Sequence, residues 1–173
     1  MAAYQHQHAS GPTRSARKPT DLLSYPALID RLEEEINRST RHSTPLCCLL
    51  LRLENLKEIG RIHGTEIVEQ LVAYTSMTLR SEFRRFDRLG EISEEEFMVL
   101  LPGADSLRSE IVARRVLGRL RAIKVELDDQ RVPLRVTISV VAWHGGQTAE
   151  QLLAHARAAT PREQLGLGDA VRI

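Results

Sequence analysis

Hydrophobic residues follow two different periods along this chain, and each period predicts a different kind of element. Apolar side chains recur every three or four positions, as in amphipathic helices, over residues 26–39, 54–60, 65–79, 105–120 and 148–159. Strands are predicted over residues 46–53, 87–92, 97–101, 125–127, 132–143 and 170–173. The first of these strands is almost continuously apolar, which predicts a central strand covered on both faces.

Helices and strands mixed in this order predict an α/β fold with one mixed sheet packed by helices. The chain of 173 residues is long enough for one domain, which we assign to residues 20–173. Residues 1–19 are polar and mildly basic, so we expect a disordered tail there. That tail lacks the apolar segment of a signal peptide, and the longest apolar run, residues 46–51, is too short to cross a bilayer. The sequence therefore predicts no membrane insertion.

Composition narrows the classes of function. The net charge is +1, so there is no basis for non-specific nucleic-acid binding. Aromatic residues make up only 4% of the chain, which argues against a stacking platform for single-stranded nucleic acid. Cys47 and Cys48 are adjacent on a predicted strand and point to opposite faces, so we interpret them as small buried hydrophobes and not as a metal pair. Without a disulfide framework, the chain fits a reducing, cytoplasmic setting.

The most informative stretch is residues 84–102, RRFDRLGEISEEEFMVLLP. Arg84 and Asp87 form an Arg-x-x-Asp step, and after five intervening residues an acidic turn spans residues 93–97. An apolar strand follows and stops at Pro102. This stretch resembles the signature hairpin of the GGDEF domains, the bacterial diguanylate cyclase family, in which a Gly-Gly-Asp/Glu-Glu-Phe turn follows an Arg-x-x-Asp inhibitory site.

Four further segments resemble the same family in the same order, and they are residues 49–59, 59–64, 135–141 and 149–159. The resemblance covers roughly residues 21–173. It implies the nucleotide-cyclase-like GGDEF fold, with a central mixed, mainly antiparallel five-stranded sheet flanked by helices.

The resemblance also implies that the metal site is damaged. A family metal carboxylate at the end of the first strand corresponds to Arg52, whose guanidinium cannot ligate a cation and would repel it. Glu95 stands at the metal-binding acid of the turn, and Glu96 matches the next acid. We therefore expect no bound Mg²⁺ and no other cofactor.

The resemblance also implies that two further requirements of catalysis are missing, the close approach of the backbone to the nucleotide and the recognition of guanine. Ser93 and Glu94 replace the glycines that let the backbone approach the nucleotide, and Glu94 adds a negative charge where a triphosphate would lie. Gly60 replaces an asparagine that contacts guanine in the family. The expected outcome is a degenerate domain that does not make cyclic di-GMP and is not an enzyme.

The retained Arg-x-x-Asp step suggests that the domain still binds cyclic di-GMP. In the family this site binds the product with help from an arginine on the following helix, a position that falls on Arg115. Arginine forks fit phosphate oxygens or the guanine edge, and aspartate accepts from guanine N–H groups. The plainer interpretation is that Arg84 and Asp87 form a surface ion pair at i, i+3 spacing and that Arg115 is simply solvated.

Two other functions stay open from the sequence. One is a nucleotide-independent scaffold that binds a protein partner or forms a homodimer. The other is a residual or altered cyclase that uses Glu95 and Glu96. Loss of activity on replacing either acid would favour the latter.

Overall fold

The computed structural model describes residues 22–123, 125–127, 130–159 and 170–172. The predicted tail, residues 1–19, lies outside these ranges. The elements in chain order are α1 (Tyr25–His42), β1 (Leu46–Leu53), α2 (Leu56–His63), α3 (Thr65–Glu82), β2 (Arg88–Glu91), β3 (Glu96–Pro102), α4 (Ser106–Arg121), β4 (Val125–Leu127), β5 (Gln130–Val132), β6 (Val136–Ala142), α5 (Ala149–Ala158) and β7 (Ala170–Arg172).

The predicted mixed sheet is confirmed. Its strand order is β2-β3-β1-β6-β7, with three antiparallel pairings and one parallel pairing between β6 and β7. Strand β1 lies at the centre, as its continuous apolar run predicted, and its bounds are those expected. A separate two-stranded ribbon is formed by β4 and β5.

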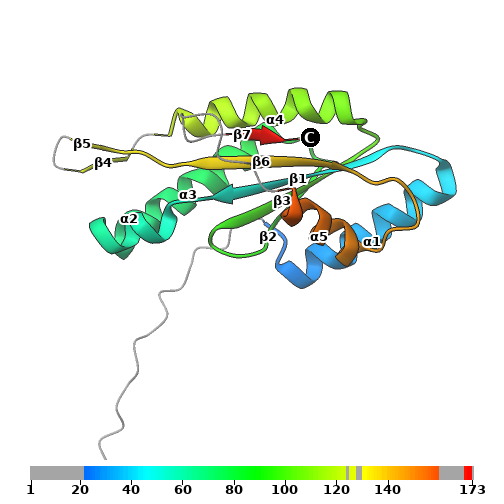
Figure 1. Ribbon diagram of the computed structural model, residues 1–173, viewed down its shortest axis with the longest axis horizontal. Helices are drawn as coiled ribbons and strands as arrows, with labels where there is room; N and C mark the ends of the chain where they lie inside the picture. The colour runs from blue at the N-terminus through cyan, green and yellow to red at the C-terminus, as the bar shows by residue number, and fades with distance from the viewer. Residues whose placement is uncertain (1–21, 124, 128–129, 160–169, 173) are drawn as a thin grey trace, which may run out of the picture.

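Helices cover both faces of the sheet (Figure 1). One core packs Leu49, Leu51 and Leu53 of β1 against α2, α3 and α4. The other packs Leu46, Cys48 and Leu50 against α1 and α5. Neighbouring residues of β1 thus enter opposite cores, because successive strand side chains point to opposite faces. Cys47 and Cys48 are both buried, as expected, and both are free thiols.

Several element boundaries were wrongly predicted. Helices α1 and α3 each continue three residues past their expected ends, to His42 and Glu82, and two further differences have a clear cause. The expected strand 132–143 is divided by residues 133–135, because Pro133 has no N–H to donate to a ladder and the N–H of Arg135 bonds to the Asn55 side chain. Helix α2 does not end near Gly60 but continues to His63. It stops at Gly64, where the backbone has a φ of +90° that glycine adopts without strain.

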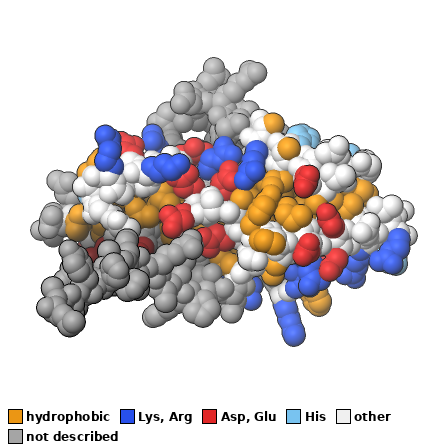
Figure 2. Space-filling model, turned by 90° about the horizontal axis from the view of Figure 1, so that it is seen from below, with side chains coloured by type: hydrophobic (Ala, Val, Ile, Leu, Met, Phe, Trp, Pro, Cys, Tyr) orange, Lys and Arg blue, Asp and Glu red, His pale blue; other side chains and the backbone are white. Residues whose placement is uncertain are grey.

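On the face seen from below in Figure 1, acidic and basic side chains are interspersed around hydrophobic ones (Figure 2). This mixture matches the near-zero net charge of the sequence. Within the described part of the chain, we find no helix with the length and apolar character needed to cross a membrane.

Candidate functional site

The acidic turn between β2 and β3 meets the end of β1. Antiparallel pairing places Arg52 of β1 opposite Glu96 of β3 on one side and opposite Thr137 of β6 on the other. The turn is held from within, since the Ser93 hydroxyl accepts a hydrogen bond from the Glu95 N–H at 3.2 Å. It is also tied to β1, because the Leu53 N–H donates to the Glu95 carbonyl at 2.8 Å.

Glu96 is bound by two arginines from different elements. Its Oε1 accepts from Arg52 at 2.9 Å, and its Oε2 accepts from Arg157 of α5 at 2.7 Å. The Glu96 side chain is only 14% exposed. Burial raises the pKa of Glu96, but the hydrogen bonds and charges of Arg157 and Arg52 outweigh that effect and hold the pKa below its usual range. The Glu96 carboxylate is therefore ionised, and its negative charge is balanced by Arg52 and Arg157.

Glu95 also has a cationic partner. Its Oε2 lies 3.3 Å from the Nζ of Lys57 on α2. The Lys57 side chain is largely exposed, so this pair is screened by water and weaker than the one at Glu96. Glu94 and Ser93 lie exposed at the tip of the same turn.

A pocket of about 440 Å³ lies between α2, α3 and this turn. Gly60 and Val68 line it on the helix side, and Glu94 and Glu95 line it on the turn side. Gly60 offers the pocket no polar side chain. A Cβ at Gly60 would lie 3.0 Å from Val68 Cγ2, so the two helices pack closely there. The pocket therefore has acidic groups on the turn side, and on the helix side it has apolar groups together with the cationic Lys57.

Within the described ranges, no three His, Cys, Asp or Glu side chains gather closely enough to hold an ion. Arg52, Glu95 and Glu96 lie together at the end of β1. Their chemistry is that of ion pairs, since each carboxylate faces a cationic side chain.

Sequence reasoning missed Arg157. It comes from α5, 61 residues after Glu96, and no local motif connects the two. Its position depends on how α5 packs against the sheet, which periodicity alone does not reveal.

The Arg-x-x-Asp step forms a tight turn after α3. The Asp87 carboxylate accepts a hydrogen bond from the backbone N–H of Arg84 at 2.9 Å, and the Asp87 N–H donates to the Arg84 carbonyl at 3.1 Å. Arg84 and Asp87 are thus joined through the backbone of Arg84, and this contact fixes the orientation of the Asp87 carboxylate. Between these two residues is Phe86, which is 77% exposed.

Arg115 of α4 lies next to this turn. Its Nε lies 3.1 Å from Glu82 Oε2, and its guanidinium also donates to the Glu82 carbonyl at 2.9 Å. Glu82 is the last residue of α3, two positions before Arg84. Arg119, which the site prediction did not include, contacts the same carboxylate at 3.2 Å. The three predicted residues are therefore brought to one region, with Glu82 between the helix and the turn.

Comparison with known proteins gives consistent results. The family model described as diguanylate cyclase, GGDEF domain, matches residues 18–165. Diguanylate cyclase DgcP of Pseudomonas aeruginosa is 29% identical over 158 residues, which are 89% of this chain and 23% of that protein. Response regulator PleD of Caulobacter vibrioides is 30% identical over 143 residues, 79% of this chain and 31% of that protein. The chain thus spans less than a third of the length of these relatives.

Solved structures of similar fold include two of particular interest. Diguanylate cyclase SiaD of Pseudomonas aeruginosa, solved in complex with its activator SiaC, has a TM-score of 0.77 and 27% identity over 84% of this chain and 56% of that one. The GGDEF domain of DgcB from Caulobacter crescentus, solved with c-di-GMP, has a TM-score of 0.77 and 15% identity over 86% of this chain and 90% of that one. At that identity, the second similarity shows the fold alone.

Proposed function

This chain belongs to the GGDEF domain family, and from that premise we propose that it is a catalytically inactive signalling domain. In this proposal it binds cyclic di-GMP through Arg84, Asp87 and Arg115 and relays the binding to a protein partner. The proposal has two parts, the loss of catalysis and the retention of ligand binding, and each has its own test.

The observation that carries the loss of catalysis is the double ion pair on Glu96. Mg²⁺ needs anionic oxygen ligands, and here both oxygens of that carboxylate accept from guanidinium groups, at 2.9 Å from Arg52 and 2.7 Å from Arg157. Arg52 stands where the family has a metal carboxylate, so a divalent cation there would be repelled by its fixed positive charge and by that of Arg157. These residues do not fit a metal-bound triphosphate, and Glu94 opposes its approach further.

The test of inactivity is incubation of the purified protein with GTP and either Mg²⁺ or Mn²⁺, followed by chromatography of the nucleotides. We expect no cyclic di-GMP above a control without enzyme. Product that disappears in Glu95→Gln or Glu96→Gln would overturn inactivity and favour the residual cyclase.

Retained binding is supported by the way the three residues are held. The Asp87 carboxylate is already oriented by its hydrogen bond from the Arg84 N–H. Its remaining acceptor positions can therefore bind guanine N–H groups without reorganisation. The Arg115 side chain is 51% exposed and can reach a phosphate, although it must first leave Glu82. The exposed ring of Phe86 offers a stacking surface for a purine base.

The test of binding is calorimetric titration with cyclic di-GMP. We expect micromolar or tighter binding by the wild type and at least tenfold weaker binding by Arg84→Ala. Arg80→Ala, an exposed change on α3, serves as the matched control and should bind as the wild type does. Equal affinity in Arg84→Ala would reject this site.

A nucleotide-independent scaffold is the second candidate function. The observation that favours it is the set of large apolar side chains left exposed on α3 and α4, with Met77 at 68%, Leu107 at 69% and Ile111 at 60%. A scaffold would show no thermal shift with cyclic di-GMP but would form a homodimer or a stable complex with a protein partner. Sedimentation with and without the nucleotide separates the two proposals.

A further inference from the structure

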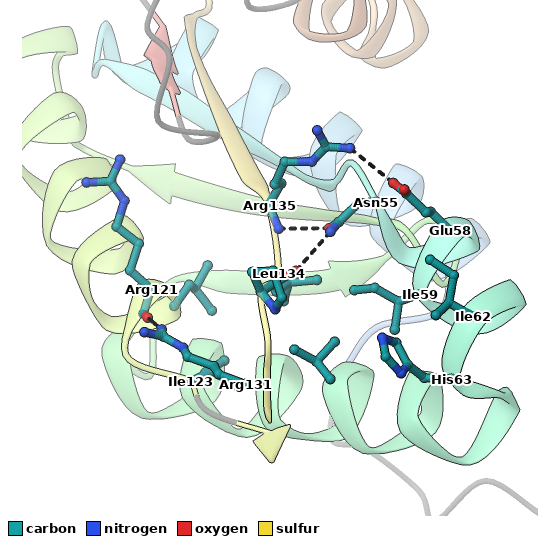
Figure 3. A pocket seen from close by; sticks show the side chains of 13 residues that line it. Asn55, Glu58, Ile59, Ile62, His63, Arg121, Ile123, Arg131, Leu134 and Arg135 are labelled. Carbon is teal, nitrogen blue, oxygen red and sulfur yellow. Dashed lines mark hydrogen bonds and ion pairs between the residues drawn. The ribbon is translucent and has the colours of Figure 1, made fainter. Parts of the chain in front are cut away.

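A second and larger cavity, of about 750 Å³, lies on the opposite side of α2 from the acidic turn. Figure 3 shows Ile59, Ile62 and His63 extending from α2 on one side and Ile123 and Arg131 on the other, with Leu134 between them. Its volume falls in the range of small-molecule sites, which is roughly 300–1,000 Å³. None of the residues that form the ion pairs on Glu95 and Glu96 line it.

The wall of this cavity is preformed. One side of it consists of residues 133–135, the segment that divides β5 from β6, and the Asn55 side chain fixes that segment. The Asn55 side chain donates to the Pro133 carbonyl at 2.9 Å and accepts from the Arg135 N–H at 2.8 Å. Because Asn55 is itself more than nine-tenths buried, its two bonds hold the wall rigidly in place. A ligand would therefore meet a cavity that needs little reorganisation.

The interior of the cavity is apolar. Ile59, Leu120 and Val132 are buried at its base, and Ile123 and Leu134 are partly buried. Ile62 is 60% exposed, which leaves apolar surface in water unless something covers it. An apolar chain or ring of a ligand would bury this surface.

The rim is cationic among the residues described. Three arginines and one glutamate line the cavity, and they are Arg121, Arg131, Arg135 and Glu58. The Arg131 guanidinium donates to the Arg121 carbonyl at 2.8 Å, which uses one of its five N–H donors. Arg135 reaches Glu58 only at 3.5 Å, and both side chains are about half exposed, so this pair is weak. Anionic oxygens can therefore bind to both guanidinium groups.

We propose that this cavity is a binding site for an amphiphilic organic anion, with an apolar chain or ring on the isoleucines and a carboxylate or phosphate on Arg131 and Arg135. A ligand needs both parts to use the whole cavity. Inorganic phosphate would leave the apolar base empty, and a neutral apolar molecule would gain no charge interaction with Arg131 and Arg135. The site is independent of cyclic di-GMP binding.

The test is titration of the full chain with octyl phosphate while the isoleucine methyl groups are followed by NMR. We expect saturable shifts at Ile59, Ile62 and Ile123, which line the cavity, and none at Ile111 or Ile138, which do not. Octanoate should give the same pattern, whereas inorganic phosphate and octanol should bind at least tenfold more weakly. The ratio of the octyl phosphate and octanoate affinities tells which head group is preferred.

Two variants and a control complete the experiment. Arg131→Gln combined with Arg135→Gln, and separately Ile62→Asp, should each weaken octyl phosphate binding about tenfold. Arg114→Gln removes an arginine from the outer surface of α4, where it pairs with Glu110, and should leave binding unchanged. The unperturbed methyl spectrum of the core isoleucines checks that each variant is folded. No saturable shift in the wild type, shifts at other isoleucines, or unchanged binding in both cavity variants would overturn the proposal.

Discussion

Replacing Glu96 with Gln should destabilise the fold, because it removes the charge that two arginines share. Glu96 is 14% exposed, whereas Arg52 and Arg157 are 26% and 43% exposed. A hydrogen bond to a charged group contributes about 1.5–3 kcal/mol. The exposure of Arg157 lowers its share, and the Gln oxygen still accepts from one arginine. We therefore expect the free energy of unfolding to fall by about 2 kcal/mol at neutral pH.

The loss should depend on pH in a defined direction. Burial raises the pKa of Glu96, but Arg157 and Arg52 together hold it below the usual range. A carboxylate with a depressed pKa contributes stability above the unfolded-state pKa of about 4.3 and loses that contribution as the pH falls through its folded-state pKa. The difference between wild type and Glu96→Gln should thus be full at pH 7 and should shrink below about pH 4.

Urea denaturation followed by fluorescence measures this difference, since Trp143 is the single tryptophan of the chain. Glu94→Gln, at the exposed tip of the same turn, is the matched control and should change the free energy of unfolding by less than about 0.5 kcal/mol. Equal stability of Glu96→Gln and wild type at pH 7 would refute the reasoning. A loss of the same size at pH 7 and at pH 3 would refute the electrostatic explanation.

Two further predictions concern glycines and a helix cap, each measured by the same urea assay. A Cβ at Gly90 would lie 2.8 Å from Leu28 of α1, so Gly90→Ala should cost about 1–3 kcal/mol, whereas Gly118→Ala, in open space on α4, should stabilise by up to about 1 kcal/mol. The reverse order of these two variants would contradict the close packing of α1 on β2. Thr148 and Gln151 form a capping box at the start of α5, so Thr148→Ala should cost about 1 kcal/mol, and an unchanged stability would show that the box contributes nothing.

Helix and strand positions could be predicted from the chain because local periodicity encodes which face of an element is buried. The apolar run of residues 46–53 coincides with β1, and the helix predicted over 105–120 is observed as α4, Ser106–Arg121. The strand prediction over 132–143 failed because a polar side chain from elsewhere competes with local preference. Asn55 binds the Pro133 carbonyl and the Arg135 N–H, 78 and 80 residues away, and so divides a strand that alternation alone would continue.

For the candidate site, too, one part could be predicted from the sequence and another part depends on the tertiary structure. The residue types at positions 52, 93 and 94 are properties of the sequence, and by comparison with the family they already predicted a damaged metal site and a crowded turn. Which charges face each other was decided by the tertiary structure. Strand pairing sets Arg52 opposite Glu96, the packing of α5 adds Arg157, and the packing of α3 on α4 joins Arg115 to Glu82. The physical reason is that side-chain periodicity is local, whereas an ion pair depends on the position of two elements that only a packed core brings together.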